Sequence, residues 1–318
     1  MKNYQAIQSQ QPEPKAWPKV AIIVLNWNSW RDTSECLKSL QRITYPNYRV
    51  IVVDNGSTDG SGDRLRAEFC QHIFIMTNKN LGFAGGNNAG IEYALSEEFS
   101  YLLLLNNDTQ VLNGNFLHEM VRYAEDNPEV GVIGPTVYNT EKEVQHTILY
   151  FPTLFNTICR RYLQVGENAC GKLQRVEAVS GCCFLVRSKA IEEVGLLDEN
   201  FFLYAEEIEW CYRMRKAGWK VIYLPVKSVL HYGAQTTKRE PQKMYILKRS
   251  NLVYMLAKHG FTVQGAVLGS LIIINHLRKI ILSALKIVSY DQIQNWALLK
   301  ELAKDILTKW RLGRSEAS

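Results

Sequence analysis

Short apolar runs recur along the first third of the chain, and each ends in a cluster of Asn, Asp, Ser or Gly. The predicted strands cover 20–25, 50–53, 72–77 and 101–105, and helical patterning follows the first three at 29–40, at 62–70 and up to Leu95. Nearly continuous apolar strands that alternate with helices are typical of a mostly parallel sheet covered on both faces. The sequence therefore predicts an α/β fold.

The polar clusters form the first candidate site. They occupy 26–28, 54–61, 80–88 and 106–108, directly after the four predicted strands. A loop rich in Asn, Asp and Gly is by itself usually only a turn. Ligands of parallel sheets, however, bind beyond the carboxyl ends of the strands. The four clusters are therefore expected to line one crevice.

The later pattern divides the chain into segments. Helices are predicted at 116–125, 190–194 and 204–217, and strands at 130–133, 178–186 and 219–224, the last leading to 229–231. No element is predicted for 138–176, and the pattern is helical from Pro241 onwards. The expected organisation is a flexible leader at 1–18, a main domain at 19–240 and a helical C-terminal segment at 241–318.

Composition excludes several classes of protein. With 47% hydrophobic and 21% charged residues the chain is an ordinary globular one. The seven cysteines are scattered without a CxxC pair, which argues against a zinc knuckle or a disulfide framework. We expect them to be buried apolar residues in a reducing compartment. The N-terminal leader lacks the apolar core of a signal peptide, so a cytoplasmic location is predicted.

The net charge of +6 is concentrated in the C-terminal segment. Residues 241–318 hold 12 Lys and Arg against 4 Asp and Glu, and residues 259–277 contain none of these four types. The basic excess favours an anionic membrane surface or a nucleic acid as neighbour, with a solvated basic helix face as the alternative. For 259–277 an interfacial amphipathic segment is the favoured interpretation, and a core-packed helical extension and a membrane span are the alternatives. No nucleic-acid partner is predicted, because no motif for one is present.

Asp108 is the predicted metal ligand. It follows the strand at 101–105, and Mg²⁺ or Mn²⁺ takes oxygen ligands, often one or two protein carboxylates plus substrate phosphates. An N-cap or Asx-turn role is the structural alternative. A calcium loop at 54–65 is rejected because its sixth and twelfth positions are Asp59 and Leu65, and the glycines at 82–90 lack the spacing of a dinucleotide fingerprint.

The chain resembles the bacterial family 2 glycosyltransferases, and within them the rhamnosyltransferase-like members that build surface polysaccharides. The resemblance covers about residues 19–235 and lies in the serial motifs VLNWNSW, VVDNGSTDGS, NKNLGFAGGNNAG, LLLLNNDT, SGCCFLVR, GLLDENFFLYAEEIEWCYRMRKAGW and HYGAQT. It implies a GT-A-type, mostly parallel nucleotide-binding sheet with flanking helices, to which the C-terminal helical extension is added.

The resemblance also implies how the donor binds. The base and ribose are expected at Asn26, Asp54 and Asn55, with Ser57 shaping the loop; amides and carboxylates suit pyrimidine edges and ribose hydroxyls. Gly82, with the glycines at 85–86, is expected to let the backbone approach the donor. Further donor contacts are expected from Asn28, Asn80, Phe83, Asn87, Asn106 and Asn107.

The family's metal motif is commonly Asp-x-Asp, and Asn106 stands here at its first position. One carboxylate is lost, so metal binding is expected to depend on the donor diphosphate and on a second ligand. The resemblance points to His231 in the HYGAQT segment for that role. A structural histidine at the end of a strand is the alternative.

Inverting transfer needs a base that takes the proton of the acceptor hydroxyl. The family places it in a Glu-Asp pair that aligns with Glu206-Glu207; Glu207 is expected to be the base, and Glu206 its alternative or a ligand of acceptor hydroxyls. Glu209 is expected to pair with Arg213, four residues on, while Trp210 packs inward. The alternative for the three glutamates is a solvated first helical turn.

Gly181 and Cys182 are expected to lie under the donor sugar and the acceptor, without a catalytic thiol. The predicted function is inverting transfer of a sugar, rhamnose first, from dTDP-rhamnose or a UDP-sugar to a hydroxyl of a growing glycan. A lipid-linked acceptor would suit a protein held peripherally at the inner face of the cell membrane. The alternatives are a noncatalytic sugar-nucleotide-binding protein with a decayed site and a nucleotidyltransferase.

Overall fold

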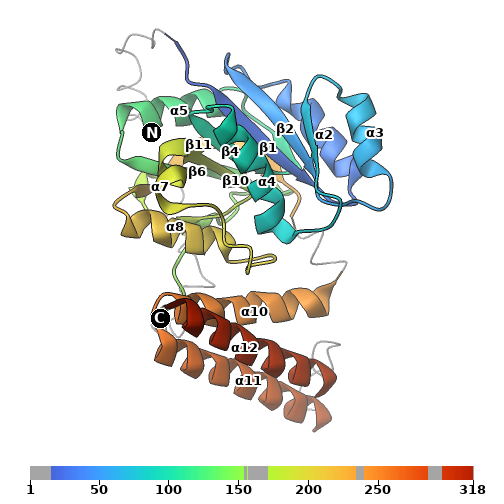
Figure 1. Ribbon diagram of the computed structural model, residues 1–318, viewed down its shortest axis with the longest axis vertical. Helices are drawn as coiled ribbons and strands as arrows, with labels where there is room; N and C mark the ends of the chain where they lie inside the picture. Colours follow the sequence, from blue (N-terminus) through green and yellow to red (C-terminus); the bar gives the residue numbers. More distant parts are fainter. Residues whose placement is uncertain (1–15, 154–155, 157–170, 234–239, 286–295, 318) are drawn as a thin grey trace.

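A mixed sheet forms the centre of the main domain in the computed structural model, which describes residues 16–153, 156, 171–233, 240–285 and 296–317 (Figure 1). Its nine strands run in the order β3-β2-β1-β4-β10-β6-β11-β5, with β8 beside β11, and β7 and β9 form a separate two-stranded sheet. The strands are β1 (Val20–Asn26), β2 (Tyr48–Asp54), β3 (Ile73–Met76), β4 (Tyr101–Asn106), β5 (Thr109–Val111), β6 (Val130–Tyr138), β7 (Ile148–Leu149), β8 (Gln174–Arg175), β9 (Ala178–Val179), β10 (Cys183–Arg187) and β11 (Lys220–His231).

Alternation along the strands sends side chains into two cores, one on each face of the sheet. Ala21 and Ile23 of β1 belong to one core, and Val20, Ile22 and Val24 to the other. On the Ala21 face lie α4 (Gly82–Ser96), α7 (Ser188–Val194) and α8 (Glu206–Lys216), and on the Val20 face lie α2 (Trp30–Leu40), α3 (Ser61–Glu68) and α5 (Phe116–Asp126). The predicted α/β fold with flanking helices is confirmed.

The parallel half of the sheet follows the prediction closely. Strands β1, β2, β3 and β4 pair in parallel, and their carboxyl ends reach the predicted polar clusters. The other half contains strands that run in opposite directions: β10 lies antiparallel between β4 and β6, and β11 is parallel to β6 but antiparallel to β5 and β8.

Two predicted strands have different bounds in the structure. The run at 178–186 is not one strand, because β9 pairs with β7 while β10 joins the main sheet, and the turn at 180–182 separates them. The strand at 219–224 continues to His231 through irregular pairing with β6 around Pro225, where the apolar pattern breaks. Strands β7 and β8 lie in the stretch 138–176, for which no element was predicted.

Two predicted helices begin elsewhere. Helix α4 starts at Gly82, so the second half of the third polar cluster is helical instead of loop. A Cβ on Gly86 would stand 2.6 Å from Cδ1 of Leu25, so glycine at this position lets α4 pack closely on β1. Helix α8 starts at Glu206, because Tyr204 and Ala205 adopt φ values of +73° and +76°.

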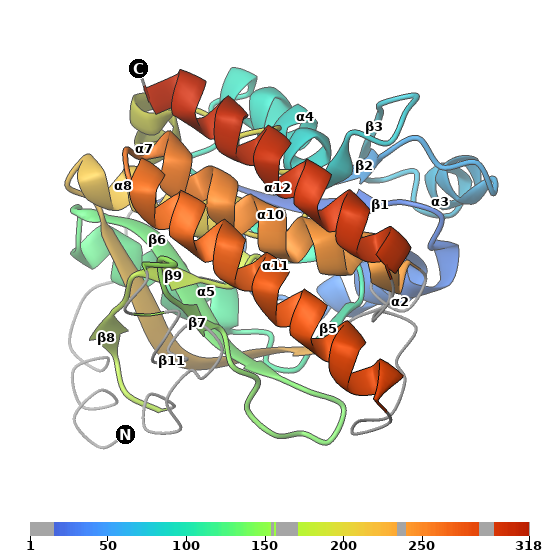
Figure 2. The ribbon, with the colours of Figure 1, turned by 90° about the horizontal axis from the view of Figure 1, so that it is seen from below.

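The C-terminal segment forms a layer of three helices against the main domain (Figures 1 and 2). These are α10 (Pro241–Lys258), α11 (Thr262–Ala284) and α12 (Trp296–Ala317). Helix α10 is buried from Leu252 to Ala257 and shares its core with Phe201 and Ile208 of the main domain. Helix α10 therefore packs the C-terminal segment onto the main domain.

Helix α11 differs from α10 in its exposure. Within the described residues, Thr262–Ser283 is the one helical stretch that is long and apolar enough, by length and composition only, to cross a membrane. Only 28% of its most apolar part is buried. Val263, Val267, Leu271, Ile274 and Ile281 are exposed. Because they lie three, four or seven residues apart, they form one apolar stripe along the helix.

The cysteines largely follow the prediction. Cys36, Cys182, Cys183 and Cys211 are buried, and all four are free thiols. The prediction of burial is wrong for Cys70, which is exposed just beyond the end of α3. Residues 159 and 170, the two other cysteines, lie outside the described part of the chain.

Candidate active site

A cavity of about 390 Å³ opens at the carboxyl ends of β1, β2 and β4, and α10 forms its opposite wall. All four polar clusters contribute to its lining, through Trp27, Asn55, Asn80 and Asp108 among others, so their predicted convergence is confirmed. The predicted site residues that line the cavity are Asn55, Asn80, Gly82, Phe83, Asn106, Asn107, Asp108, Gly181, Cys182, Glu206, Glu207 and His231.

Other predicted donor residues do not line the cavity and instead bond to one another. Asn26 is fully buried, and its Nδ2 donates hydrogen bonds to Asp54 Oδ1 (2.7 Å), Ser57 Oγ (3.1 Å) and Ser61 Oγ (3.0 Å). The Oδ1 of Asn28 accepts from the backbone N–H of Thr58 at 2.8 Å. In the structure these side chains fix the shape of the loop that follows β2.

Hydrogen bonds of Asn55 also connect the end of β2 to the start of α4. Asn55 Nδ2 donates to Asn80 Oδ1 (3.2 Å) and to the carbonyl of Gly82 (2.9 Å), and its Oδ1 accepts from the N–H of Leu81 at 3.0 Å. Asn87, another predicted donor ligand, lies one turn into α4 and donates to the carbonyl of Phe83 at 2.8 Å. Asn55 thus fixes the end of β2 against the start of α4, whereas the contact of Asn87 lies within α4.

Asp108 and His231 meet at one side of the cavity. They lie on the paired strands β5 and β11 or directly beside them, and Asp108 Oδ1 is 3.2 Å from His231 Nε2. The other ring nitrogen, Nδ1, is 3.0 Å from Gln145 Oε1. An amide oxygen only accepts, so the contact with Gln145 suits the tautomer with the proton on Nδ1, and in that tautomer Nε2 keeps a lone pair for a cation.

This pair fits a divalent cation that is held jointly with a diphosphate. A carboxylate oxygen and a neutral imidazole nitrogen are suitable first ligands, and Gln145 orients the imidazole as outer partners of metal-bound histidines do. The described residues contain no group of three or more His, Cys, Asp or Glu side chains that could hold a metal. Substrate oxygens would therefore have to complete the coordination. Gln145 lies in the stretch without a predicted element, and no sequence signal marked it.

Glu206 and Glu207 begin α8 on another side of the cavity. Each has an Oε2 atom that is buried and receives no hydrogen bond from the described protein groups. Burial raises the pKa of both carboxyls; repulsion from Glu207 raises the pKa of Glu206 further, whereas backbone N–H groups, including that of Gly181, partly offset the effect on Glu207. These backbone N–H groups therefore favour the ionised form of Glu207.

A strained turn places these carboxylates. Positive φ is costly for residues other than glycine, and Tyr204 and Ala205 adopt it in succession. Asn251 of α10 is fully buried, and its Nδ2 donates to the carbonyls of Leu203 (3.0 Å) and Tyr204 (2.8 Å). The C-terminal layer thereby holds the turn that aims Glu206 and Glu207. No sequence signal marks Asn251, which lies in the segment beyond the family motifs.

We expect Asn251→Ala to lower kcat about tenfold, because two buried carbonyls lose their donor, at a cost of about 1–3 kcal/mol that lets the turn relax. Steady-state kinetics would measure the change, together with an unchanged KM for the donor. Asn275→Ala, which alters an exposed asparagine of α11, is the matched control. Equal kcat values for the two variants would contradict the role of Asn251.

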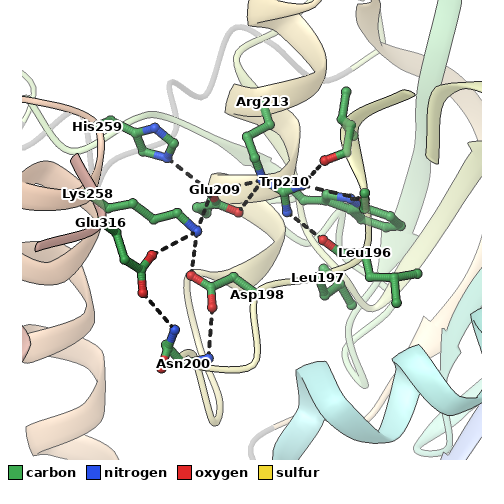
Figure 3. Close-up of polar contacts among 12 residues, drawn as sticks. Leu196, Leu197, Asp198, Asn200, Glu209, Trp210, Arg213, Lys258, His259 and Glu316 are labelled. Atoms are coloured by element: carbon green, nitrogen blue, oxygen red, sulfur yellow. Dashed lines mark hydrogen bonds and ion pairs between the residues drawn. The ribbon is translucent and has the colours of Figure 1, made fainter. Parts of the chain in front are cut away.

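Glu209 holds the C-terminal layer through a network of charged side chains (Figure 3). It accepts from Arg213 Nε at 2.9 and 3.0 Å, as predicted, and lies 3.3 Å from Lys258 Nζ and 3.1 Å from His259 Nε2. Lys258 also reaches Asp198 at 2.6 Å. Desolvation alone would raise the pKa of Glu209, but its cationic partners outweigh this effect and the net shift is downward.

We expect Glu209→Gln to destabilise the protein by about 3 kcal/mol, because Arg213 and Lys258 lose a buried counter-charge. Thermal unfolding should show a fall in Tm of roughly 6–12 °C, whereas Glu301→Gln, at an exposed position of α12, should change little. The pKa of Glu209 is lowered by folding, so its contribution is complete above the ordinary value of 4.5 and disappears as the pH falls through the lowered one. An undiminished difference at acid pH would oppose this account.

The floor of the cavity is formed by the turn between β9 and β10. A Cβ on Gly181 would lie 3.5 Å from Phe83 Cζ and 3.8 Å from Cβ of Glu207. Burial raises the pKa of the Cys182 thiol to about 12. The thiol therefore stays protonated at neutral pH, which agrees with the expectation that it is not a nucleophile.

The parallel half-sheet, the polar strand ends and the acidic cavity together define a glycosyltransferase of the GT-A fold. Residues 21–195 match the model of the family described as glycosyl transferase family 2. The chain belongs to this family.

Characterised relatives and a solved structure agree with this assignment. The chain is 27% identical over 258 residues to the low-salt glycan biosynthesis hexosyltransferase Agl10 of Haloferax volcanii, covering 78% of this chain and 76% of the relative. It is 25% identical over 284 residues to the N-acetylglucosaminyl-diphospho-decaprenol L-rhamnosyltransferase of Mycobacterium tuberculosis, covering 80% and 91%. The mannosyltransferase PcManGT of Pyrobaculum calidifontis, solved with GDP-Man and Mn²⁺, superposes with a TM-score of 0.54 at 16% identity, covering 99% of this chain and 78% of the other.

Proposed function

We propose that the protein transfers a sugar, with inversion, from a nucleotide diphosphate to an acceptor hydroxyl. The observation that carries this proposal is the placement of Glu207 and of the Asp108–His231 pair on the same cavity. Glu207 Oε2 is available to accept the proton of the attacking hydroxyl, which strengthens the nucleophile. The donor diphosphate would leave toward Asp108 and His231.

Asp108 and His231 are the proposed ligands of Mg²⁺ or Mn²⁺. A cation bound there would neutralise charge that develops on the departing diphosphate. The chain itself supplies orientation: Gln145 fixes the imidazole of His231, and Asn106 Nδ2 lies 3.3 Å from the same Nε2 atom. Because Asn106 stands where the family commonly has a carboxylate, metal and donor should bind cooperatively.

Rhamnose from dTDP-rhamnose is the first donor to test. L-rhamnosyl transfer is named for the mycobacterial relative, and the serial motifs resemble the rhamnosyltransferase-like branch. A panel of dTDP-, UDP- and GDP-sugars with Mn²⁺, assayed for transfer to N-acetylglucosaminyl-diphospho-polyprenol and for release of free nucleotide, would decide the donor. A protein that binds a sugar nucleotide but neither transfers nor hydrolyses it would be the noncatalytic alternative, and release of pyrophosphate from a nucleoside triphosphate would indicate a nucleotidyltransferase.

A lipid-linked glycan is the proposed acceptor, at the cytoplasmic face of the membrane. The relative from Mycobacterium tuberculosis is named for an acceptor on a diphospho-decaprenol carrier. The exposed apolar stripe of α11 supports contact with such a membrane, since Val263 and Ile274 are 77% and 60% exposed. Arg278 and Lys279 lie on the same helix, between Ile274 and Ile281, and suit anionic headgroups.

We expect Ile274→Asp to weaken binding to phosphatidylglycerol vesicles about tenfold, because one inserted side chain contributes roughly 1.5 kcal/mol or more. Co-sedimentation with vesicles would measure the partition. Met76→Asp changes an exposed apolar residue of the main domain and should leave the partition unchanged. Vesicle binding by Ile274→Asp at the wild-type level would rule out the stripe as the contact.

A further inference from the structure

The charges around the cavity are divided between its walls. Away from α10, the acidic lining residues are Asp32, Asp108, Glu206 and Glu207, whereas Glu240, at the start of α10, is paired with Lys243. Among the described lining residues, Lys and Arg side chains come only from α10, as Lys243 and Lys248. A diphosphate beside α10 would therefore meet Lys248 before it reaches the carboxylates on the other walls.

Lys248 lies against an aromatic ring and, among the described residues, away from any carboxylate. Its Nζ lies 4.3 Å from the centroid of the Tyr204 ring, and within the described residues no carboxylate oxygen lies within ion-pair distance. Partial desolvation, and then repulsion from Arg249, lower the pKa of Lys248. Lys243 lies 5.2 Å from the centroid of the Phe202 ring and 3.0 Å from Glu240. An anion beside Lys248 would restore the charge balance of this wall.

The position of these lysines favours the acceptor over the donor. Both stand over the segment 202–204, which leads into Glu206 and Glu207. The base removes a proton from the acceptor, so the acceptor must approach this segment. The donor diphosphate is already assigned to the opposite pair, Asp108 and His231.

The apolar stripe lies near the same end of the helical layer. Helices α10 and α11 are joined by the short connection 259–261 and run back along each other, so the start of α10 lies beside the later part of α11 (Figure 2). The contact between Tyr245 Oη and His276 Nδ1, at 3.1 Å, fixes this register. Lys243 and Lys248 therefore lie between the cavity and the exposed Ile274 and Ile281.

We propose that Lys248, assisted by Lys243, binds the diphosphate that links the acceptor glycan to its polyprenyl carrier. The inference rests on the proposed function, because it assigns residues to the acceptor of that reaction. The carrier chain would leave along α11 toward the membrane, and the terminal sugar would point to Glu207.

A binding experiment tests the subsite without any transfer reaction. Farnesyl diphosphate is titrated calorimetrically into the protein in metal-free buffer that contains EDTA. Lys248→Ala should raise its Kd about tenfold, the loss of one charge-assisted contact, and Lys248→Arg should largely retain binding. Lys300→Ala, which removes an exposed lysine of α12, should match the wild type. An unchanged Kd in Lys248→Ala overturns the proposal.

Two further measurements distinguish an acceptor subsite from a donor subsite. Saturating dTDP should leave farnesyl diphosphate binding unaffected; competition would assign Lys248 to the donor and overturn the proposal. In transfer assays, Lys248→Ala should raise KM for a diphosphate-linked acceptor but not for the same sugar on a neutral alkyl chain, and not for the donor. If the wild type transfers no sugar while Lys248-dependent binding persists, the proposed function fails and the diphosphate subsite stands.

Discussion

Glu207→Gln is expected to reduce kcat/KM by about two to four orders of magnitude, with little change in donor affinity. The amide keeps the size of the side chain but does not accept a proton, so the acceptor hydroxyl loses its base. Transfer rates at saturating donor, and equilibrium binding of dTDP, would measure the two quantities separately. The loss should appear in the chemical step and not in Tm.

Glu206→Gln is the matched control, because burial and the neighbouring Glu207 favour the neutral form of Glu206, which an amide imitates. Its activity should stay within about tenfold of the wild type. The reverse order of effects would show that Glu206 is the base. For the wild type, kcat/KM should fall toward acid pH with a midpoint above the ordinary glutamate pKa of 4.5. Burial raises the pKa of Glu207, and activity rises as this group loses its proton.

Asp108→Asn is expected to lower transfer by about two to three orders of magnitude, the range for loss of one preorganised electrostatic partner of a developing charge. The remaining rate should need more Mn²⁺, because His231 and the donor diphosphate would hold the cation without a carboxylate. Initial rates over a range of Mn²⁺ concentrations would measure this shift. Calorimetric titration of dTDP with and without Mn²⁺ gives a second readout that does not depend on turnover.

Asp32→Asn provides the control for Asp108, since Asp32 lines the same cavity but accepts a hydrogen bond from Ser29 Oγ at 2.7 Å. It should change the Mn²⁺ requirement little.

Gln145→Ala should weaken metal affinity by about 10- to 100-fold, because the imidazole of His231 loses the partner that orients it. Mn²⁺ curves that coincide for Asp108→Asn and the wild type would refute the metal assignment.

The sequence was sufficient to predict the parallel half of the fold and most of the lining of the cavity. Buried strands such as β1 and β4 are continuous apolar runs, and the ends of parallel strands must share one edge of the sheet. Local spacing also predicted the pairing of Glu209 with Arg213, because residues four apart on a helix are neighbours. These features depend on contacts between residues close together in the sequence, or on a pattern of apolar strands and polar clusters that repeats along the chain.

Only the tertiary structure decided which side chains face the cavity and what holds them there. Asn26 and Asp54 lie at the predicted strand ends, yet their mutual hydrogen bond turns them into the loop. Gln145 reaches His231 from 86 positions away in the chain, and Asn251 reaches Tyr204 from 47 positions away. No local pattern encodes such contacts, because they arise when separate elements pack together. The sequence alone predicted the chemistry proposed for the site, and the packing of the C-terminal helices determined how its carboxylates are aimed.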